Sequence, residues 1–548
     1  MKIKLSITGA IIALLAALIL LGSYYTDRLV TPFLNNFLEK NKPLKHNITY
    51  EKFRLNLVKR QLLITGIRMT PDTSWTQDEN VWMEIHVSSV ELTQFRIMKF
   101  LIHKKLRIGD LIFIEPRVIV HLLEKQTDKV RSARAETTAE KINLASFKGL
   151  SLKNILLADG EFKLYREEDD LNASSSDIDF SGQDISFERD ETDQQIIMHF
   201  GESSISIKDI EWHPKTSLYT ISVDELLATN LDSTILIHNI RVSPDFSKTD
   251  FSRMIDFQDD RFDLQVGKVT INRIGYERML AGHPAEISKL LVEHLEADIY
   301  RDKNVAINIH KYPDFYNESF LKIPLPLVLD TLSIVDAVIQ YGELAEGNDE
   351  PGVIRLEEFT AMATDLRNYR DSIRMKTAMN VKMRAKVMGE GILNVELQLP
   401  LEGDLHRFTC KGSVGAMALA PLNPMLEPAI SMRINGGTLT RMTFDFKADD
   451  HESNGWMEFL YKDLDVVILK KNHDKQWEFI SALANTAVLS NNPPAGKEVK
   501  GVDIGYERDK NKGIINYIWK TLQSGLVRTI IPVKKYQMNR DSKKNMEE

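Results

Sequence analysis

Alternation of apolar and polar residues is the dominant pattern of this chain. In its clearest example every second residue from Met379 to Val387 is apolar, the chain turns at Gly389-Glu390-Gly391, and Leu393 to Leu399 repeat the alternation. The same period recurs from Met442 to Ala448 and from Met457 to Tyr461. A period of two with one polar face is typical of antiparallel strands that bury one side. We therefore predict a mainly β fold of antiparallel strands.

A weak internal repeat supports strands through the middle of the chain. Its frame is apolar, hydroxyl, apolar, any residue, polar, then small or apolar, and it occurs at Leu150–Ile155, Ile205–Ile210, Val269–Ile274 and Leu332–Ala337. The irregular spacing argues against a strict solenoid and suits strands stacked along one growing sheet. Strand propensity alone is the alternative explanation of these four matches.

Two segments carry helical patterns. Thr31 and Pro32 suit the N-cap and first position of a short helix, which either packs on the next domain or lies on a membrane surface. Near the C-terminus, apolar residues recur at helical spacing and predict an amphipathic helix from Lys512 to Ile531, ending at Pro532. Its expected role is to close a sheet edge or an apolar opening, and docking to a membrane or a partner is the alternative.

The N-terminus predicts a membrane anchor. Residues 5–22 contain no charge and follow Lys2 and Lys4. About 20 apolar residues span a bilayer core, and the positive-inside bias places the following chain across the membrane. A cleaved signal peptide is the competing interpretation, but the small-residue cleavage pattern is poor and Tyr24-Tyr25 suit an aromatic interface anchor.

Composition narrows the class of protein. The 548 residues are 43% hydrophobic, which permits a large core, and the formal net charge of -8 offers no basic surface for nucleic acid. A single cysteine, Cys410, excludes an intrachain disulfide, so the core itself must provide stability outside the cytoplasm.

Two polar stretches help to divide the chain. Gln126 to Lys141 is nearly free of large apolar residues, and Asn485 to Gly501 interrupts the strand pattern before the terminal helix. We predict five regions: a transmembrane anchor at 1–26, an N-terminal β region with a short entry helix at 27–125, a polar loop or linker at 126–146, an extended β-sheet at 147–505, and the amphipathic helix with a basic tail at 506–548.

The sequence contains no constellation typical of catalysis. Metalloprotease, nucleophile-elbow, phosphate-loop and Cys-x-x-Cys motifs do not occur, and the 13 histidines are scattered. The acidic pairs Asp177/Asp179 and Asp259/Asp260 are better explained as solvated loop residues than as cation ligands. We therefore predict a protein that is not an enzyme and has no cofactor or metal.

Several segments resemble the AsmA-like superfamily of bacterial envelope proteins. After the single N-terminal span come Tyr50–Pro71, Ile108–Leu122 and Leu150–Tyr165, in the order seen in that family, and Gly412–Leu469 resembles a related branch of uncharacterised bacterial proteins. The resemblance implies an elongated, twisted β-sheet curled into a groove. It implies anchorage in the bacterial inner membrane, with the bulk in the periplasm and a contribution to outer-membrane lipid homeostasis or envelope biogenesis.

The expected function is to bind or conduct lipid along an apolar β-groove. The implied partners are phospholipid or another envelope lipid, the inner membrane through residues 5–22, and outer-membrane or envelope proteins. A non-enzymatic structural or adaptor ectodomain of tandem β-sandwiches is the alternative, because closed sandwiches also need period-two strands. Soft methionine side chains favour the lipid-facing interpretation. The candidate lipid-facing stripe comprises Met379, Val381, Met383, Val387, Leu393, Val395, Leu397, Met442, Phe444, Phe446, Met457 and Phe459.

Overall fold

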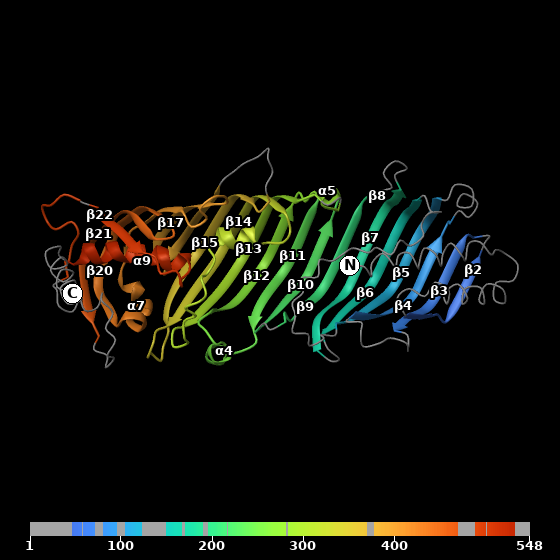
Figure 1. Ribbon diagram of the computed structural model, residues 1–548, viewed down its shortest axis with the longest axis horizontal. Helices are drawn as coiled ribbons and strands as arrows, with labels where there is room; N and C mark the ends of the chain where they lie inside the picture. The colour runs from blue at the N-terminus through green and yellow to red at the C-terminus, as the bar shows by residue number, and fades with distance from the viewer. Residues whose placement is uncertain are drawn as a thin grey trace. The chain divides into compact units, whose positions relative to one another are not determined.

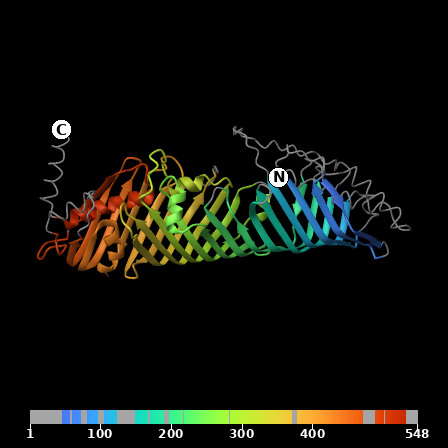
Figure 2. The same cartoon turned by 90° about the horizontal axis from the view of Figure 1, so that it is seen from below.

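Most described residues of this protein lie in β-strands, which confirms the predicted mainly β class. The computed structural model forms two compact units, which divide between Ile237 and His238 (Figure 1). Figure 2 shows the strands of each unit lying side by side. The structure describes residues 46–56, 59–71, 81–95, 105–122, 149–166, 170–189, 196–215, 218–280, 283–369, 378–469, 488–499 and 501–531.

The first unit is a mixed sheet. Its strands are β1 (His46–Thr49), β2 (Lys52–Asn56), β3 (Gln61–Pro71), β4 (Val81–Thr93), β5 (Lys105–Leu122), β6 (Gly149–Arg166), β7 (Asp170–Arg189), β8 (Ile196–His199), β9 (Ser203–Trp212) and β10 (Tyr219–Thr229). Strands β1 and β2 both pair with β3, and β3 to β7 pair in chain order. At the other end β8 and β9 both pair with β7, and β10 pairs with β9. Strand β11 (Thr234–Pro244) contains the division between the units.

The second unit is also built on one mixed sheet. Its strands are β12 (Asp260–Asn272), β13 (Ala285–Asp302), β14 (Leu327–Leu344), β15 (Gly352–Arg367), β16 (Ala378–Val387), β17 (Gly391–Pro400), β18 (Phe408–Val414), β19 (Met417–Ala418), β20 (Met432–Ala448), β21 (Glu452–Ile468) and β22 (Val502–Glu507). They pair in chain order, with β18 and β19 both on β20. The described helices are α4 (Lys248–Met254), α5 (Tyr276–Leu280), α6 (Tyr316–Leu321), the 3-10 turn η4 (Ala420–Leu422), α7 (Asn423–Ile430) and α9 (Ile514–Ile530).

Two strand pairs are parallel, so the prediction of a wholly antiparallel sheet was wrong at these places. Strand β5 pairs in parallel with β6, and β13 with β14. Parallel neighbours need a crossover of a dozen or more residues, whereas a hairpin turn can be very short. Residues 123–148 and 303–326 supply these long connections. The predicted linker at 126–146 belongs to the first connection and lies outside the described residues.

The predicted hairpin is confirmed as β16 and β17. Val381 faces Leu397 and Met383 faces Val395, so the apolar residues of both strands share one face. The turn lies slightly earlier than predicted. Met388 and Gly389 both have positive φ, 52° and 73°, and the Glu390 N–H donates to the Val387 carbonyl at 3.0 Å. Two consecutive left-handed residues match the right-handed twist of a hairpin.

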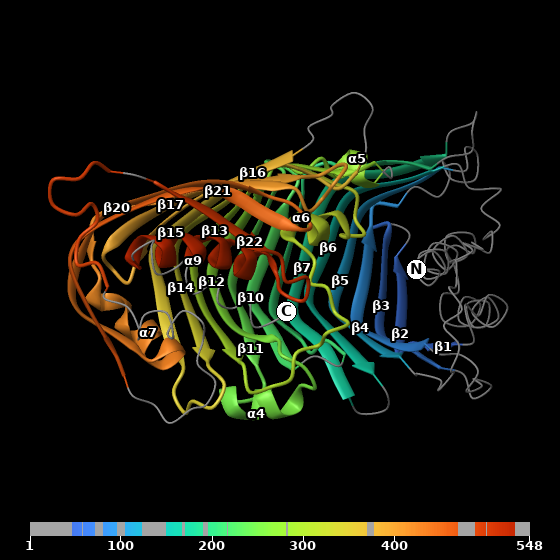
Figure 3. The same ribbon diagram turned by 60° about the vertical axis from the view of Figure 1, so that its left-hand side comes forward.

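Left-handed residues also occur in the middle of the long strands. In the second unit His294, Asp336 and Glu358 have φ between 48° and 56°, and register shifts accompany Asp336 and Glu358. In the first unit Glu115 and Asp159 also have positive φ and interrupt the pairing of the parallel strands β5 and β6. Such β-bulges bend a strand and increase its twist. In the second unit the strands curve so that the side carrying α9 is concave (Figure 3).

The C-terminal helix is confirmed as α9, which begins at Ile514 and ends at Ile530. The predicted anchor at 5–22 and the helix expected after Thr31 lie outside the described residues. Within the part of the chain that the structure describes, no helix is long and apolar enough to cross a bilayer.

The bulge at Asp336 provides a test of the fold. We expect Asp336→Val to lower the free energy of unfolding by about 1–2 kcal/mol, because a β-branched residue is strained in the left-handed region. Asp336→Gly loses the same contact to His294 without that strain and should be close to wild type. Urea denaturation measures both. Asp330→Val, an exposed change on β14 at an ordinary backbone conformation, is the control, and equal losses at both positions would contradict the bulge argument.

Candidate functional site

One face of the second unit's sheet is apolar from strand to strand. The registers align one residue from each successive strand in a row: Val269, Val292, Ile334, Ala361, Met383, Val395, Gly412, Phe444, Met457 and Val502. The neighbouring row contains Ile271, Leu290, Leu332, Ala363, Val381, Leu397, Cys410, Phe446, Gly455 and Ile504. We call this surface the apolar face.

The opposite face carries charges. Lys382 and Lys411 both approach Glu396, at 3.5 and 2.9 Å, and Arg441 pairs with Glu458 at 2.5 Å. These pairs are exposed and contribute little stability. Their consequence is that the two sides of the sheet differ sharply in polarity.

The structure brings all the predicted stripe residues onto the apolar face, but most of them are packed inside a core. The buried members of its main cluster are Met379, Leu397, Met442, Phe444, Phe446, Met457 and Phe459, each 8% exposed or less. Val381, Met383 and Val395 pack partly buried against this cluster. Val387 is 9% exposed and Leu393 is partly buried. The stripe at β16 to β21 therefore contacts protein in this structure.

Helix α9 covers the apolar face at β21 and β22 with small residues. A Cβ on Gly525 would come within 2.4 Å of Ile504 Cγ2 and 2.5 Å of Met457 Cε, so the helix backbone lies close to the sheet. Next to it, the buried Thr521 hydroxyl lies 2.6 Å from Ser453 Oγ and donates to the Tyr517 carbonyl at 2.9 Å. The buried polar groups of this contact are thus paired.

The most buried line of α9 carries mainly small or polar residues, and large apolar residues flank it. The buried residues Tyr517, Thr521, Gly525 and Thr529 follow one another at spacings of four. The predicted apolar residues pack as expected at Ile514, which is buried, and at Ile518, Leu522, Leu526 and Ile530, which lie partly buried against the core. Ile515 and Trp519 are 58% and 49% exposed, so the expected packing is wrong for these two. The missed signal was the four-residue spacing of small residues, which permits close approach of a helix to its support.

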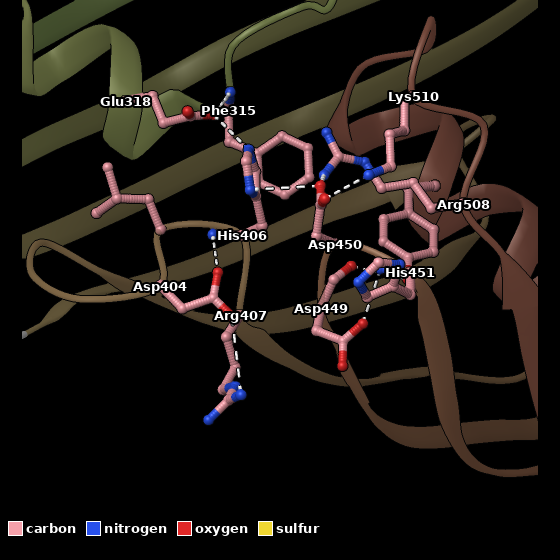
Figure 4. Close-up of polar contacts among 12 residues, drawn as sticks. Phe315, Glu318, Asp404, His406, Arg407, Asp449, Asp450, His451, Arg508 and Lys510 are labelled. Carbon is pink, nitrogen blue, oxygen red and sulfur yellow. Dashed lines mark hydrogen bonds and ion pairs between the residues drawn. The ribbon is translucent and has the colours of Figure 1, made fainter.

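A polar cluster joins the elements at this end of the second unit (Figure 4). Asp450 accepts from Arg508 Nη1 and from Lys510 Nζ, the latter at 2.5 Å. The ring of His406 lies between two carboxylates, 3.4 Å from Asp450 and 3.4 Å from Glu318. The cluster connects α6, the turns before β18 and β21, and the segment that leads to α9.

Arg508 is the most buried member of this cluster. Its side chain is only 3% exposed, and its guanidinium lies 4.4 Å above the centre of the Phe315 ring. The hydrogen bond from Lys510, together with the charges of Arg508 and His406, lowers the pKa of Asp450 against the effect of burial. Because a buried cation needs a partner, the Asp450 carboxylate stabilises the position of the segment before α9.

One border of the apolar face ends in charged residues. Asp260, Arg301 and Glu343 lie directly across from one another on β12, β13 and β14. The Arg301 guanidinium donates to both Asp260 oxygens at 2.7 Å, and the Lys303 ammonium lies 2.5 Å from Glu343 Oε1. Sequence analysis expected Asp260 to be a solvated loop residue, which was wrong: it lies on β12, is 24% exposed and pairs with Arg301. The border as a whole was missed because its members come from separate strands and share no local motif.

The site offers no obvious reactive group. Burial raises the pKa of the Cys410 thiol to about 12, so this cysteine is protonated and inert at neutral pH. Across the described ranges, no three His, Cys, Asp or Glu residues gather as metal ligands. The arrangement is suited to binding through apolar contact and charge.

No family model and no curated protein matches this chain. The resemblance to AsmA-like proteins therefore remains a prediction.

The polar cluster predicts a specific instability. Asp450→Asn should lower the free energy of unfolding at pH 7 by about 1–3 kcal/mol, because it leaves the Arg508 cation without its anionic partner. Asp404→Asn removes the exposed pair with Arg407 at 3.7 Å and should be nearly neutral. Urea denaturation of both variants, followed by tryptophan fluorescence, measures the difference.

The same cluster predicts an acid dependence. Because the pKa of Asp450 is lower in the folded state, its stabilisation is complete above the ordinary carboxyl pKa of 3.8 and is lost as the pH falls through the lowered value. Wild type should lose more stability than Asp450→Asn between pH 5 and pH 3. Parallel stability curves for the two proteins would exclude this role.

The close contact of α9 makes a separate prediction. Gly525→Leu should displace the helix from β21 and β22 and cost about 1–3 kcal/mol, since the new side chain overlaps Ile504. Gln523→Leu adds the same side chain to a partly exposed position of the same helix and is the matched control. Proteolysis of the C-terminal segment should accelerate in the first variant and not in the second.

Proposed function

We propose that this protein binds lipid along the apolar face of its second unit, as a membrane-anchored envelope protein of the AsmA-like kind. The observation that carries the proposal is the continuity of the apolar rows from the packed end at β18 to β22 into strands β12 to β14, where all the row side chains except the buried Val269 stay partly exposed.

Coverage by helices differs along this face. Helix α9 packs on β21 and β22, and α7 packs on β14, β15 and β20. On β12 to β14, Val292, Leu295 and Ile334 are only partly buried, and Phe262 is 37% exposed. An acyl chain laid on these rows would gain about 0.8 kcal/mol for each methylene that it buries.

The described strands of the second unit form one sheet, which supports an open face over the alternative of tandem β-sandwiches. A sandwich would need a second sheet packed about 10 Å away to cover the rows. A structural or adaptor role would leave the exposed part of the apolar face without a purpose.

The envelope setting of the proposal comes from the sequence. The uncharged run at 5–22 suits an inner-membrane anchor, with the bulk of the chain in the periplasm. Lipid bound beyond the membrane surface would then serve outer-membrane lipid homeostasis or envelope biogenesis. This part of the proposal rests on the predicted anchor and on the resemblance.

Adjacent positions on β14 provide a matched test. Ile334 belongs to the apolar face, and its neighbour Ser333 belongs to the opposite face. We expect Ile334→Asp to reduce lipid retained by the full chain about tenfold or more, because a carboxylate on an apolar surface is strongly disfavoured beside an acyl chain. Ser333→Asp should retain the wild-type amount. Native mass spectrometry with lipid extraction counts the bound molecules.

A second variant keeps the test decisive if the Ile334→Asp protein does not fold. Phe262→Asp places the charge on the same face at a side chain that is 37% exposed, where the fold tolerates it more easily. A substitution at Phe444 would not serve, since that side chain is 3% exposed inside the core. Full lipid retention in folded Ile334→Asp and Phe262→Asp proteins, or lipid-free wild type, would refute the proposal.

A further inference from the structure

Strand β22 forms an outer edge of the second unit's sheet. Within the part of the chain that the structure describes, β22 pairs with β21 and with no other strand. Just beyond β22, the Arg508 N–H donates to the His451 carbonyl on the β21 side at 2.7 Å. Alternate residues of an antiparallel strand direct their backbone groups to opposite sides. Asp503 and Gly505 therefore direct their N–H and C=O groups away from β21.

Helix α9 supplies the partners that a neighbouring strand would supply to this edge. The Arg528 guanidinium donates to the Asp503 carbonyl at 2.7 Å, and Ser524 Oγ accepts from the Gly505 N–H at 3.1 Å. The Ser524 hydroxyl in turn donates to the Thr521 carbonyl at 2.7 Å. A donor and an acceptor on alternate residues are what an antiparallel strand presents to an edge. Side chains of α9 thus take the place of a strand beside β22.

The same helix is bonded to the edge further along β21. There the segment before β22 lies on β21, where Asn492 and Tyr461 exchange backbone hydrogen bonds of 2.9 and 3.0 Å. In this segment the Leu489 N–H donates to the Ile530 carbonyl in the last turn of α9 at 3.1 Å. Carbonyls of the last turn have no partner within a helix. Helix α9 is therefore hydrogen-bonded to both stretches that form the outer edge.

The edge of β22 is complementary to itself. If two copies of β22 run antiparallel with Ile504 opposite Ile504, Asp503 of each copy lies opposite Gly505 of the other. Outward residues that lie opposite exchange two hydrogen bonds, so each Gly505 N–H would donate to the Asp503 carbonyl of the other copy. Those are the two groups that Ser524 and Arg528 occupy in the single chain.

This register also suits a two-fold contact. Glu507 falls opposite Gly501, so no two carboxylates face each other directly. A register centred on Gly505 would instead place Asp503 opposite Glu507, a pair of like charges. A two-fold axis uses the same edge on both copies and closes the contact. Both Ile504 side chains then lie on one face, so the apolar faces of the two sheets would be continuous.

We propose that the outer edge of β22 is a pairing surface for a second copy of this chain, and that α9 covers it through Ser524 and Arg528. Free sheet edges are templates for other strands, and natural proteins commonly cover them. The chain is monomeric while α9 occupies the edge and dimerises when α9 moves away. This pairing goes beyond the proposed function and needs no bound lipid, so either proposal can fail without the other.

The test is the oligomeric state of the full chain in detergent, measured by sedimentation equilibrium. Ser524→Ala/Arg528→Gln removes both side-chain partners of the edge. We expect wild type to be monomeric and the double variant to dimerise, with an association constant at least about tenfold higher, because two hydrogen bonds no longer compete with pairing. Gln523→Ala changes the adjacent side chain of α9 and should stay monomeric.

A proline in the edge shows whether the dimers form through β22. Asp503 is exposed, and proline is tolerated on an edge strand where its missing N–H would face outward. Asp503→Pro removes one of the hydrogen bonds between the copies and leaves the pairing with β21 in place. Added to the Ser524→Ala/Arg528→Gln protein, it should restore the monomer.

Gly525→Leu gives an independent measurement should the double variant fail to fold. This change keeps Ser524 and Arg528 but displaces the helix that carries them, since its side chain overlaps Ile504. It should therefore also promote dimers that Asp503→Pro abolishes. The proposal is overturned if the folded variants remain monomeric, if their dimers survive Asp503→Pro, or if wild type dimerises equally well with α9 in place.

Discussion

Cross-strand register is the constraint on which the second unit depends. A slip of one residue would move every apolar side chain of a strand to the polar side. The bulges show how the fold keeps this register in long strands. On β13 and β14 the apolar face changes from Val292 and Ile334 to Leu295 and Ala337 across His294 and Asp336, so both strands change phase together. Their neighbours remain aligned, while each strand gains a bend.

The side chains of the apolar rows differ in size from one end of the second unit to the other, and the elements that cover them differ as well. Large side chains such as Phe408 and Phe446 fill the space under α6 and α9 and are almost completely buried. Small residues on α9 then allow the helix to lie close to β21 and β22. Towards β12 the rows consist of Val, Leu and Ile, and all of these except the buried Val269 stay partly exposed. The core therefore ends where the covering helices end, although the apolar rows of the sheet continue.

Sequence reasoning succeeded where the determining contacts are local. The β16–β17 hairpin and the extent of α9 follow from period and from turn residues within a short window. The parallel pair β5 and β6 was missed because its long connection resembles a linker, and the pair β13 and β14 because its connection lies inside the region expected to be continuous antiparallel sheet. The repeat at Leu332–Ala337 contained the bulge signal, since Asp336 interrupts the alternation, but phase changes of this kind are visible only beside a partner strand. The charged border was also missed, because Asp260 and Arg301 meet only through the fold.

The two surfaces of the proposed site impose a single orientation on an amphiphile. The apolar rows offer contact to acyl chains, while the border at Arg301 and Glu343 offers fixed charge at the edge of the same face. A lipid bound on the rows would therefore place its acyl chains against the apolar side chains and its polar end towards the border.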